Sequence, residues 1–378
     1  MNKLSTSPKQ CPHADCPGCS YDREKIPSVY TELKEFFRGK GNFPLITGEL
    51  IHWRMRAKLA VRREKGKTRI GLFEKGTHKV IEIPRCISHH PSINFAVEIV
   101  KKALLSEKIE GYDDAGRGFL RYIQCVVSNL TGKVQLVLVC NISQDRRWGK
   151  KEEKFLSLIL KNKLFHSIWI NHQTQKTNRI FSDNWSLIQG DEFIWQMIAG
   201  HKYAFHPAAF SQAHLSLYGK LLKDLAKAVD KRAHILELYC GVGVIGLHLS
   251  KFAKKVVMVE NNPFSEKSFH QSVKKLNPTA KKKIQYRLND AASAVNEHFD
   301  HLIFDPPRKG VEKELLKKVL SWKSVQKIIY VSCNVNSFMK DAAILEKGGY
   351  KTTSGRAYLL FPGSNDIEIL AVFEKKSG

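Results

Sequence analysis

The sequence predicts a mixed α/β protein whose C-terminal half holds a doubly wound parallel sheet, preceded by a smaller α+β domain. From about residue 195 onward, short apolar runs alternate with helical patterns, and this alternation is typical of parallel sheets. Between residues 46 and 192 the strand-like runs are instead joined by short turns. The chain has 378 residues and 43% hydrophobic residues, which is enough for two or three packed domains.

The charge of the chain favours a polyanionic partner. There are 62 Lys and Arg residues against 36 Asp and Glu residues, a net charge of +26, and the excess is spread along the whole chain. Nucleic acid is the partner that such a field attracts most often, although a basic but otherwise ordinary protein is the alternative.

The expected compartment follows from what the chain lacks. No apolar run is long enough to span a bilayer, and the first ten residues are polar. We therefore expect a cytoplasmic, monomeric protein with no membrane partner, whose eight cysteines are not a disulfide framework.

Residues 1–45 form the first predicted segment, which contains a tight cysteine triplet. Cys11, Cys16 and Cys19 follow the spacing C-x4-C-x2-C, so their thiols can converge on one metal centre. Cys86 can supply a fourth ligand. Thiolate ligation admits zinc or an iron–sulfur cluster, and a three-plus-one layout favours iron–sulfur. Four unrelated thiols are the alternative. A helix is expected over 28–37.

Residues 46–192 are predicted to form the central α+β domain. Alternation after residue 51 puts a row of cations on one face of a strand: Arg54, Arg56, Lys58 and Arg62. Such a row can hold phosphates, or it can be the charged, solvated edge of a sheet, and the sequence leaves both possibilities open. Strands are expected over 68–73, 79–83 and 167–171, with helices over 92–105 and 150–162. A hairpin is expected at the turn 129–132, with Cys125 and Cys140 in the core.

Residues 193–378 are predicted to form the doubly wound domain. The expected strands are 234–239, 255–260, 284–288, 301–304 and 327–331, and the expected helices are 214–229, 244–252, 263–276, 311–320 and 337–347. Two last strand-like runs, 353–361 and 366–373, have no helix between them. They predict an antiparallel pair at the edge of the sheet.

A glycine-containing turn opens this domain's first strand–helix unit. Gly241 and Gly243 stand between a predicted strand and a predicted helix, where backbone can approach a ligand closely. Glu260 ends the next strand and is positioned to accept hydrogen bonds from both hydroxyls of a ribose. Gly246 has the spacing of a third fingerprint glycine, so this motif alone does not exclude NAD.

Two further strands end in residues that can carry chemistry. Asp305-Pro306-Pro307 ends the fourth strand, and this motif is common in S-adenosylmethionine methyltransferases. Enzymes of that class that act on amino groups usually continue with an aromatic residue, and Arg308 stands there instead. Cys333 follows the apolar run 328–331, at the strand end where ligands bind in open α/β sheets. It is either a nucleophile or a small core thiol.

Together these motifs resemble the RNA uracil-C5 methyltransferases that use S-adenosylmethionine and carry an iron–sulfur cluster. The resemblance covers nearly the whole chain and is carried by the four cysteines and by Trp53-Arg54, Phe210-Ser211-Gln212, Tyr239-Cys240-Gly241-Val242-Gly243, Glu260, Asp305-Pro306-Pro307-Arg308, Ser332-Cys333-Asn334, Phe361-Pro362 and Ile367-Glu368. The N-terminal TRAM-type β-barrel domain of some relatives is expected to be missing.

The resemblance implies a reaction and a set of site residues. A thiolate that adds to C6 of uracil makes C5 nucleophilic toward the sulfonium methyl group, and a base then removes the C5 proton. The resemblance makes Cys333 the nucleophile and Glu368 the base. It implies a 4Fe–4S cluster on the four cysteines, and the implied cofactor-binding residues are Gln212, Tyr239, Gly241, Gly243, Glu260, Asn289 and Asp305. The expected partner is RNA, ribosomal rather than transfer RNA, with the target uracil splayed out of its fold.

The sequence also departs from the family pattern, at Val244, His214, Asp366 and Val335. Two other functions are therefore considered. A cytosine-C5 RNA methyltransferase would carry a cysteine just after the Asp-Pro turn, where Arg308 stands here. A non-catalytic RNA-binding protein on a degenerate methyltransferase fold would suit the departures, but it would not need Cys333 and Glu368.

Overall fold

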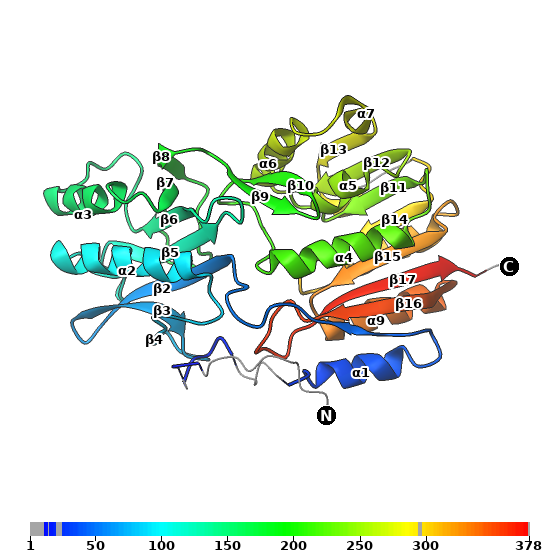
Figure 1. Cartoon of the computed structure of the whole chain (residues 1–378), viewed down its shortest axis with the longest axis horizontal. Helices are drawn as coiled ribbons and strands as arrows, with labels where there is room; N and C mark the ends of the chain where they lie inside the picture. The colour runs from blue at the N-terminus through cyan, green and yellow to red at the C-terminus, as the bar shows by residue number, and fades with distance from the viewer. Residues whose placement is uncertain (1–10, 14, 20–24, 294–296, 377–378) are drawn as a thin grey trace. The chain divides into compact units, whose positions relative to one another are not determined.

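The computed structural model describes residues 11–13, 15–19, 25–293 and 297–376 (Figure 1). The chain divides into two compact units. The first contains residues 49–196 and 211–213 together with the described residues before 23, and the second contains the described residues of 23–48, 197–210 and 214–378. The sequence had placed a domain boundary after residue 45 and a separate segment before it. Residues 25–48 instead group with the C-terminal sheet.

The first unit is built on a mostly antiparallel sheet. In the described part of the chain this sheet has seven strands, in the order β4-β3-β2-β5-β6-β7-β8, and β6 and β7 form its one parallel pair. The strands are β2 (Arg56–Glu64), β3 (Lys67–Phe73), β4 (Val80–Glu82), β5 (Leu120–Val127), β6 (Val134–Cys140), β7 (Phe165–His172) and β8 (Trp185–Gly190).

Two helices cover one face of this sheet, α2 (Pro91–Ser106) and α3 (Lys150–Leu160). Alternate strand residues face the helices and share a buried core with them, including Leu59 and Val61 of β2, Ile123 of β5 and Leu138 of β6. The intervening residues therefore project from the opposite face, because side chains alternate along a strand. This opposite face, called the open face below, carries Lys58 and Arg62.

The predicted hairpin is confirmed, since β5 and β6 pair antiparallel around residues 128–133. Cys125 and Cys140 lie in the core, as predicted. The alternative that the cationic row is a solvated sheet edge is wrong, because β2 is an interior strand that pairs with both β3 and β5.

The second unit contains the predicted alternation of strands and helices. Its elements are α1 (Val29–Phe36), β1 (Leu45–Ile46), α4 (Leu215–Ala228), β11 (His234–Leu238), α5 (Val244–Leu249), β12 (Lys255–Glu260), α6 (Pro263–Val273), α7 (Pro278–Lys281), β13 (Ile284–Leu288), the 3-10 turn η1 (Ala291–Ser293), β14 (His301–Phe304), α8 (Lys313–Ser321), β15 (Lys327–Ser332), α9 (Val335–Lys347), β16 (Tyr350–Tyr358) and β17 (Glu368–Lys375). β9 (Ile194–Ile198) and β10 (His201–Phe205) form a separate two-stranded sheet.

The large sheet is parallel except at one strand. In the described part of the chain it has eight strands, in the order β1-β16-β17-β15-β14-β11-β12-β13. β17 runs antiparallel to both of its neighbours, β15 and β16. The predicted antiparallel pair is present, but the prediction that it forms the sheet edge is wrong. β17 fills the position beside β15, and β1 pairs with β16 and extends the sheet beyond it.

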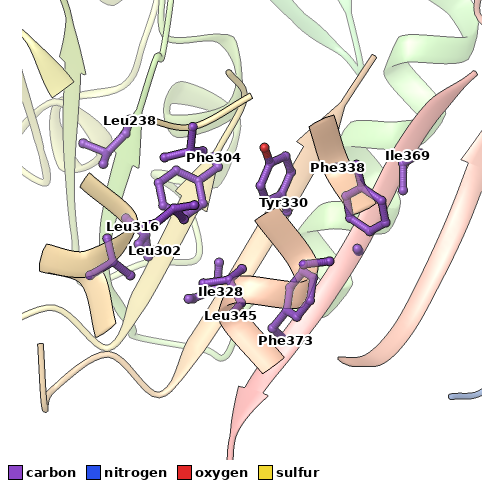
Figure 2. Close-up of a cluster of buried hydrophobic side chains, with 14 of the residues drawn as sticks. Leu238, Leu302, Phe304, Leu316, Ile328, Tyr330, Phe338, Leu345, Ile369 and Phe373 are labelled. Carbon is purple, nitrogen blue, oxygen red and sulfur yellow. The ribbon is translucent and has the colours of Figure 1, made fainter. Parts of the chain in front are cut away.

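The main core of this unit lies on one face of the sheet (Figure 2). Helices α1, α8 and α9 contribute to it, and α5 packs on the opposite face, where Gly246 lies against Met258. Phe338 of α9 is fully buried at its centre. Its ring packs against those of Tyr330 and Phe373, with centroids 5.7 and 6.4 Å away, and against that of Phe37 at 6.2 Å.

Within the described residues, no helix combines the length and the apolar character that crossing a membrane requires.

Because Phe338 is at the centre of this core, removal of its ring should strongly lower the stability of the fold. Phe338→Ala should lower the free energy of unfolding by about 3–5 kcal/mol, because the ring is lost and a cavity remains. Denaturant unfolding measures the change. Phe252→Ala is the matched control, since that ring is 43% exposed and its loss should have little effect. Equal effects of the two substitutions would contradict this description of the core.

Candidate active site

The carboxyl ends of four parallel strands bring the chemically interesting residues of the second unit to one edge of the sheet. β11 is followed by Tyr239, β12 ends at Glu260, β14 is followed by Asp305, and β15 is followed by Cys333. β17 runs the other way, so its first residue, Glu368, lies at the same edge. The register pairs Ser332 with Ile369, which puts the next residues, Cys333 and Glu368, side by side.

The turn after β11 is shaped by backbone conformations that glycine favours. Tyr239, Gly241 and Gly243 have φ angles of 63°, 55° and 77°. A Cβ atom on Gly241 would meet no atom within 4 Å, so this part of the turn faces open space. Gly246 has a different role, since a Cβ there would collide with the Met258 sulfur. The turn can thus present bare backbone to a ligand, while Gly246 allows α5 to pack on the sheet.

Glu260 is held against this turn. Its Oε2 accepts a hydrogen bond from the Gly241 N–H (3.0 Å), and its Oε1 accepts from the N–H groups of Asn261 and Asn262 (3.0 and 2.9 Å). The neighbouring strand β13 is followed by Asn289, an exposed residue whose N–H donates to the Glu260 carbonyl (2.9 Å). Oε1 already accepts two hydrogen bonds, but Oε2 accepts only one and keeps a lone pair that can accept a ribose hydroxyl.

Six of the seven residues expected to bind the cofactor therefore lie at one edge of one sheet: Tyr239, Gly241, Gly243, Glu260, Asn289 and Asp305. This arrangement fits a nucleoside-containing cofactor. Gln212 belongs to residues 211–213, which group with the first unit. Its role remains a sequence-based prediction.

Asp305 and Glu368 form a pair of carboxyls with unusual protonation. Burial, followed by repulsion from Glu260, raises the pKa of Asp305 to about 7. The Glu368 side chain is 1% exposed, and burial, followed by repulsion from Asp305, raises its pKa well above the usual range. Among the described residues Oε2 of Glu368 has no hydrogen-bond partner. Such perturbed acids cluster at catalytic sites.

Cys333 is the nucleophilic group that the strand register sets beside Glu368. Its side chain is partly exposed. Burial, followed by repulsion from Glu368, raises the thiol pKa to about 12, while Arg308 acts in the opposite direction. The thiol form therefore dominates at neutral pH. Asn334, the next residue, caps α9 through its Oδ1, which accepts from the Ser337 N–H at 2.9 Å.

Arg308, which belongs to the matching Asp-Pro-Pro-Arg motif, and Asp366, which departs from the family pattern, lie together in the structure. Arg308 donates a hydrogen bond to Asp366 at 2.8 Å. The guanidinium interacts favourably with Cys333 and Glu368, and it lowers the pKa of both groups. Arg308 is thus the cation that offsets part of the negative charge at the thiol. The two residues are 58 positions apart, so sequence spacing gave no signal for the pair.

Two buried residues near the site were missed at the sequence level. Glu237 of β11 is fully buried, and burial, followed by repulsion from Asp305, raises its pKa well above the usual range. Tyr218 of α4 is 5% exposed; burial, followed by its proximity to Asp305, Glu237 and Glu368, raises its pKa. Neither residue had a signal in the sequence, because Glu237 lies within an apolar strand and Tyr218 lies within an amphipathic helix.

The cysteines of the N-terminal segment form a separate group in the first unit. Burial raises the pKa of Cys16 and of Cys86, and repulsion from Cys11 and Cys19 raises both further, so the four sulfurs interact with one another. His13 donates a hydrogen bond to the Pro84 carbonyl, which joins this segment to the chain just before Cys86.

The cysteine group does not have metal-binding geometry. Across residues 11–13, 15–19, 25–293 and 297–376, no set of three or more His, Cys, Asp or Glu side chains is arranged as metal ligands. Its chemistry still suits a thiolate-bound centre, because the backbone at Gly18 lowers the pKa of Cys16, and the backbone at Ser88 and His89 lowers the pKa of Cys86, so both favour thiolate. The iron–sulfur cluster remains a prediction.

Two similar proteins cover almost the whole chain. An RNA methyltransferase of Protochlamydia amoebophila is 37% identical over 380 residues, which span 98% of this chain and 99% of that protein. An RNA methyltransferase of Halalkalibacterium halodurans is 28% identical and spans 100% of this chain and 86% of its own. The names of both proteins describe them as uncharacterized RNA methyltransferases.

A solved structure has the same fold. The tRNA (uracil-54, C5)-methyltransferase of Pyrococcus abyssi, in complex with S-adenosyl-L-homocysteine, superposes with a TM-score of 0.75 at 24% identity, over 95% of this chain and 86% of that chain. The family model described as tRNA (uracil-5-)-methyltransferase matches residues 23–350. The chain therefore belongs to the tRNA (uracil-5-)-methyltransferase family.

Proposed function

We propose that this protein transfers a methyl group from S-adenosylmethionine to C5 of a uridine in RNA through a covalent adduct between Cys333 and C6 of the base. The observation that carries the proposal is the pairing of a partly exposed thiol with a buried carboxyl, Glu368, across adjacent strand ends. Membership of the family supports the reaction class. A degenerate RNA-binding protein would have no use for this pair.

The residues that we propose to bind the methyl donor lie along this edge of the sheet. Gly241 and Gly243 present backbone to a ligand. Glu260 ends β12 and Asn289 follows β13, while Asp305 follows β14 on the other side of β11. When bound, S-adenosylmethionine supplies an electrophilic methyl group on a positively charged sulfur. The acidic character of the edge favours a cationic ligand.

The protein's own groups perform two steps on the uracil ring. First, Cys333 releases its thiol proton to solvent and its sulfur bonds to C6, so the electron pair of the C5–C6 double bond moves toward C5 and O4. C5 can then accept the methyl group. Second, the Glu368 carboxylate removes the proton from C5, the double bond re-forms and the sulfur leaves as thiolate. Glu368 ends the cycle protonated, and its proton passes to solvent.

Arg308 and Asp305 set the charge balance of these steps. Arg308 stabilises the thiolate of Cys333 and the carboxylate of Glu368, the two forms that react. Asp305 disfavours both forms by repulsion when it is ionised. A cationic ligand beside Asp305 would weaken that repulsion, so ligand binding would favour the reactive forms.

The cysteine group is proposed to hold an iron–sulfur cluster, with Cys11, Cys16, Cys19 and Cys86 as ligands. The mutual interaction of the four sulfurs and the backbone groups that favour the thiolate forms of Cys16 and Cys86 support this assignment. The residues fit a structural role, since the cluster would tie the N-terminal segment to residues 84–89.

Two classes of RNA are candidates for the substrate. Ribosomal RNA is the first, and it is the class expected from the sequence. Transfer RNA is the second, and it is favoured by the family description and by the tRNA substrate for which the Pyrococcus abyssi enzyme is named. Mapping of 5-methyluridine in both RNA classes, from cells with and without the protein, distinguishes the two.

The covalent step predicts a trapped complex. RNA containing 5-fluorouridine should give an adduct that survives denaturing electrophoresis, because fluorine at C5 cannot be removed as a proton. Cys333→Ala should form no adduct. Glu368→Gln should slow turnover about 10²-fold or more and accumulate the adduct on ordinary uridine. Cys240→Ala is the control for loss of a thiol and should still form the adduct. An adduct retained in Cys333→Ala would overturn the assignment.

The raised pKa of Cys333 predicts slow alkylation that accelerates with pH. Thiolate is the reacting form, so the rate of modification by iodoacetamide should rise about tenfold per pH unit between roughly pH 7 and pH 9, without levelling off. Arg308→Gln should slow the reaction at every pH, because it removes the cation that favours thiolate. Peptide mass spectrometry of Cys333 follows the rate. A plateau by pH 8 contradicts the charge balance described above.

The cluster assignment predicts a coloured protein. Protein purified without oxygen should be brown and contain about four iron and four sulfide per chain. Cys16→Ser should lose the visible absorption, whereas Cys125→Ala, a core thiol in the same unit, should keep it. A colourless protein with stoichiometric zinc would overturn the iron–sulfur assignment.

A further inference from the structure

A hollow on the open face of the first unit is not accounted for by the methyl-transfer site. It has a volume of about 620 Å³ and lies over strands β2, β3 and β5, beside residues 112–114 and 176–180. Ligand sites of this size are common, and a hollow this large accepts a nucleotide rather than a lone ion. It is called the basic aromatic pocket below.

The pocket concentrates positive charge. Besides His78, its charged lining consists of one carboxylate, Asp114, and four cations, Lys58, Arg62, Arg121 and Lys176. Within the described part of the chain none of the four cations forms an ion pair. Asp114 lies 3.6 Å from His78 and is mostly exposed. The pocket therefore carries an excess of uncompensated positive charge.

Two of the cations are buried, which makes the imbalance unusual. Arg62 is 8% exposed and Arg121 is 3% exposed. Arg62 donates hydrogen bonds to the Arg121 carbonyl (2.8 Å) and to the Tyr122 hydroxyl (2.9 Å), and Arg121 donates to the Gln173 carbonyl (2.7 Å). These neutral acceptors fix both guanidinium groups without cancelling their charge. Buried charge without a partner is costly, and an anionic ligand would offset that cost.

Aromatic rings stand among these cations. The guanidinium of Arg62 lies 4.8 Å from the ring centre of Tyr122 and 5.0 Å from that of Phe73, and the guanidinium of Arg121 lies 4.3 Å from that of Tyr112. The cations hold the rings in place from one side. Rings fixed in this way can stack nucleic-acid bases.

The open side of the pocket offers lysines for a phosphate. Lys58 and Lys176 are exposed, and Lys58 Nζ lies 4.7 Å from the ring centre of Phe181. The Lys176 Nζ donates to the Asp114 carbonyl at 3.2 Å, which positions its charge at the rim. Neither ammonium group is neutralised by a carboxylate, so both are available to a phosphodiester.

We propose that the basic aromatic pocket binds one nucleotide of an unpaired RNA segment, with the phosphate against Lys58 and Lys176 and the base against the ring of Phe73. The inference rests on the proposed function in taking RNA as the substrate. The pocket would bind the base by stacking and the phosphate by its positive charge. This contribution to RNA affinity does not depend on the methyl-transfer chemistry. Unpaired RNA fits because its bases are free to stack on protein side chains.

The experiment measures binding of the full-length protein to a fluorescent unpaired RNA oligonucleotide at several salt concentrations. Lys58→Ala/Lys176→Ala should raise the Kd at least tenfold and reduce the slope of log Kd against log salt by about 0.7, since the contacts to one phosphate are lost. Both lysines are exposed, so the fold should survive the substitution. Phe73→Leu, which keeps an apolar side chain but removes the ring, should weaken binding about fivefold or more with no change in slope.

The matched control is Lys151→Ala/Lys154→Ala, which removes two positive charges from α3 on the other face of the same sheet. It should leave Kd and slope within about twofold of wild type. If both double substitutions weaken RNA binding equally, the pocket is not the binding site, and RNA is attracted only by the overall positive charge of the protein. Free uridine or adenosine monophosphate is tested as a competitor. Displacement of the RNA by either mononucleotide at micromolar concentration would also overturn the inference, since the ligand would then be a free nucleotide.

The experiments distinguish an error in the RNA-binding inference from an error in the proposed methyl-transfer function. If the pocket variants bind RNA as wild type does and wild type still methylates uridine, the pocket assignment is wrong and the function stands. If wild type makes no 5-methyluridine while the pocket variants lose RNA affinity, the pocket stands and the function is wrong.

Discussion

The direction of one strand determines the composition of the active-site edge. β17 runs antiparallel between β15 and β16, so its first residue, Glu368, lies at the edge where β14 and β15 end. A parallel strand at this position would carry its first residue to the opposite edge, away from Cys333. The acid, the thiol and Asp305 can therefore meet only because the sheet contains this reversal. Packing of Phe338 and Phe373 in the core below holds the strand in place.

The two units carry opposite electrostatic characters. The sheet edge of the second unit gathers Glu260, Asp305 and Glu368, and the cation Arg308 favours the charged form of Glu368. Such a site suits a cationic methyl donor but disfavours a polyanion. The open face of the first unit has the reverse arrangement, with buried Arg62 and Arg121 among aromatic rings. The open face of the first unit thus offers the positive charge that a polyanion requires, while the candidate active-site edge of the second unit is acidic.

Local patterns predicted much of this structure. Alternation of apolar runs gave the doubly wound sheet, and the glycine turn, Glu260 and Cys333 follow strands as expected, because these signals are short-range. Such short-range signals do not predict which distant segments of the chain pair with each other. The edge position of β1, the ion pair between Arg308 and Asp366 and the basic aromatic pocket each join segments far apart in the chain. Tyr218 and Glu237 were hidden because buried polar side chains in regular elements leave no pattern.

The proposed mechanism requires removal of the C5 proton after an adduct has activated the ring, and tritium release measures that step directly. RNA labelled with tritium at C5 of uridine is incubated with the protein and S-adenosylmethionine carrying a carbon-14 methyl group. We expect one tritium released to water for each methyl group transferred, because Glu368 must remove the atom that the methyl group replaces. Methyl transfer without tritium release would mean that the acceptor is not C5, and the roles assigned to Cys333 and Glu368 would then be wrong.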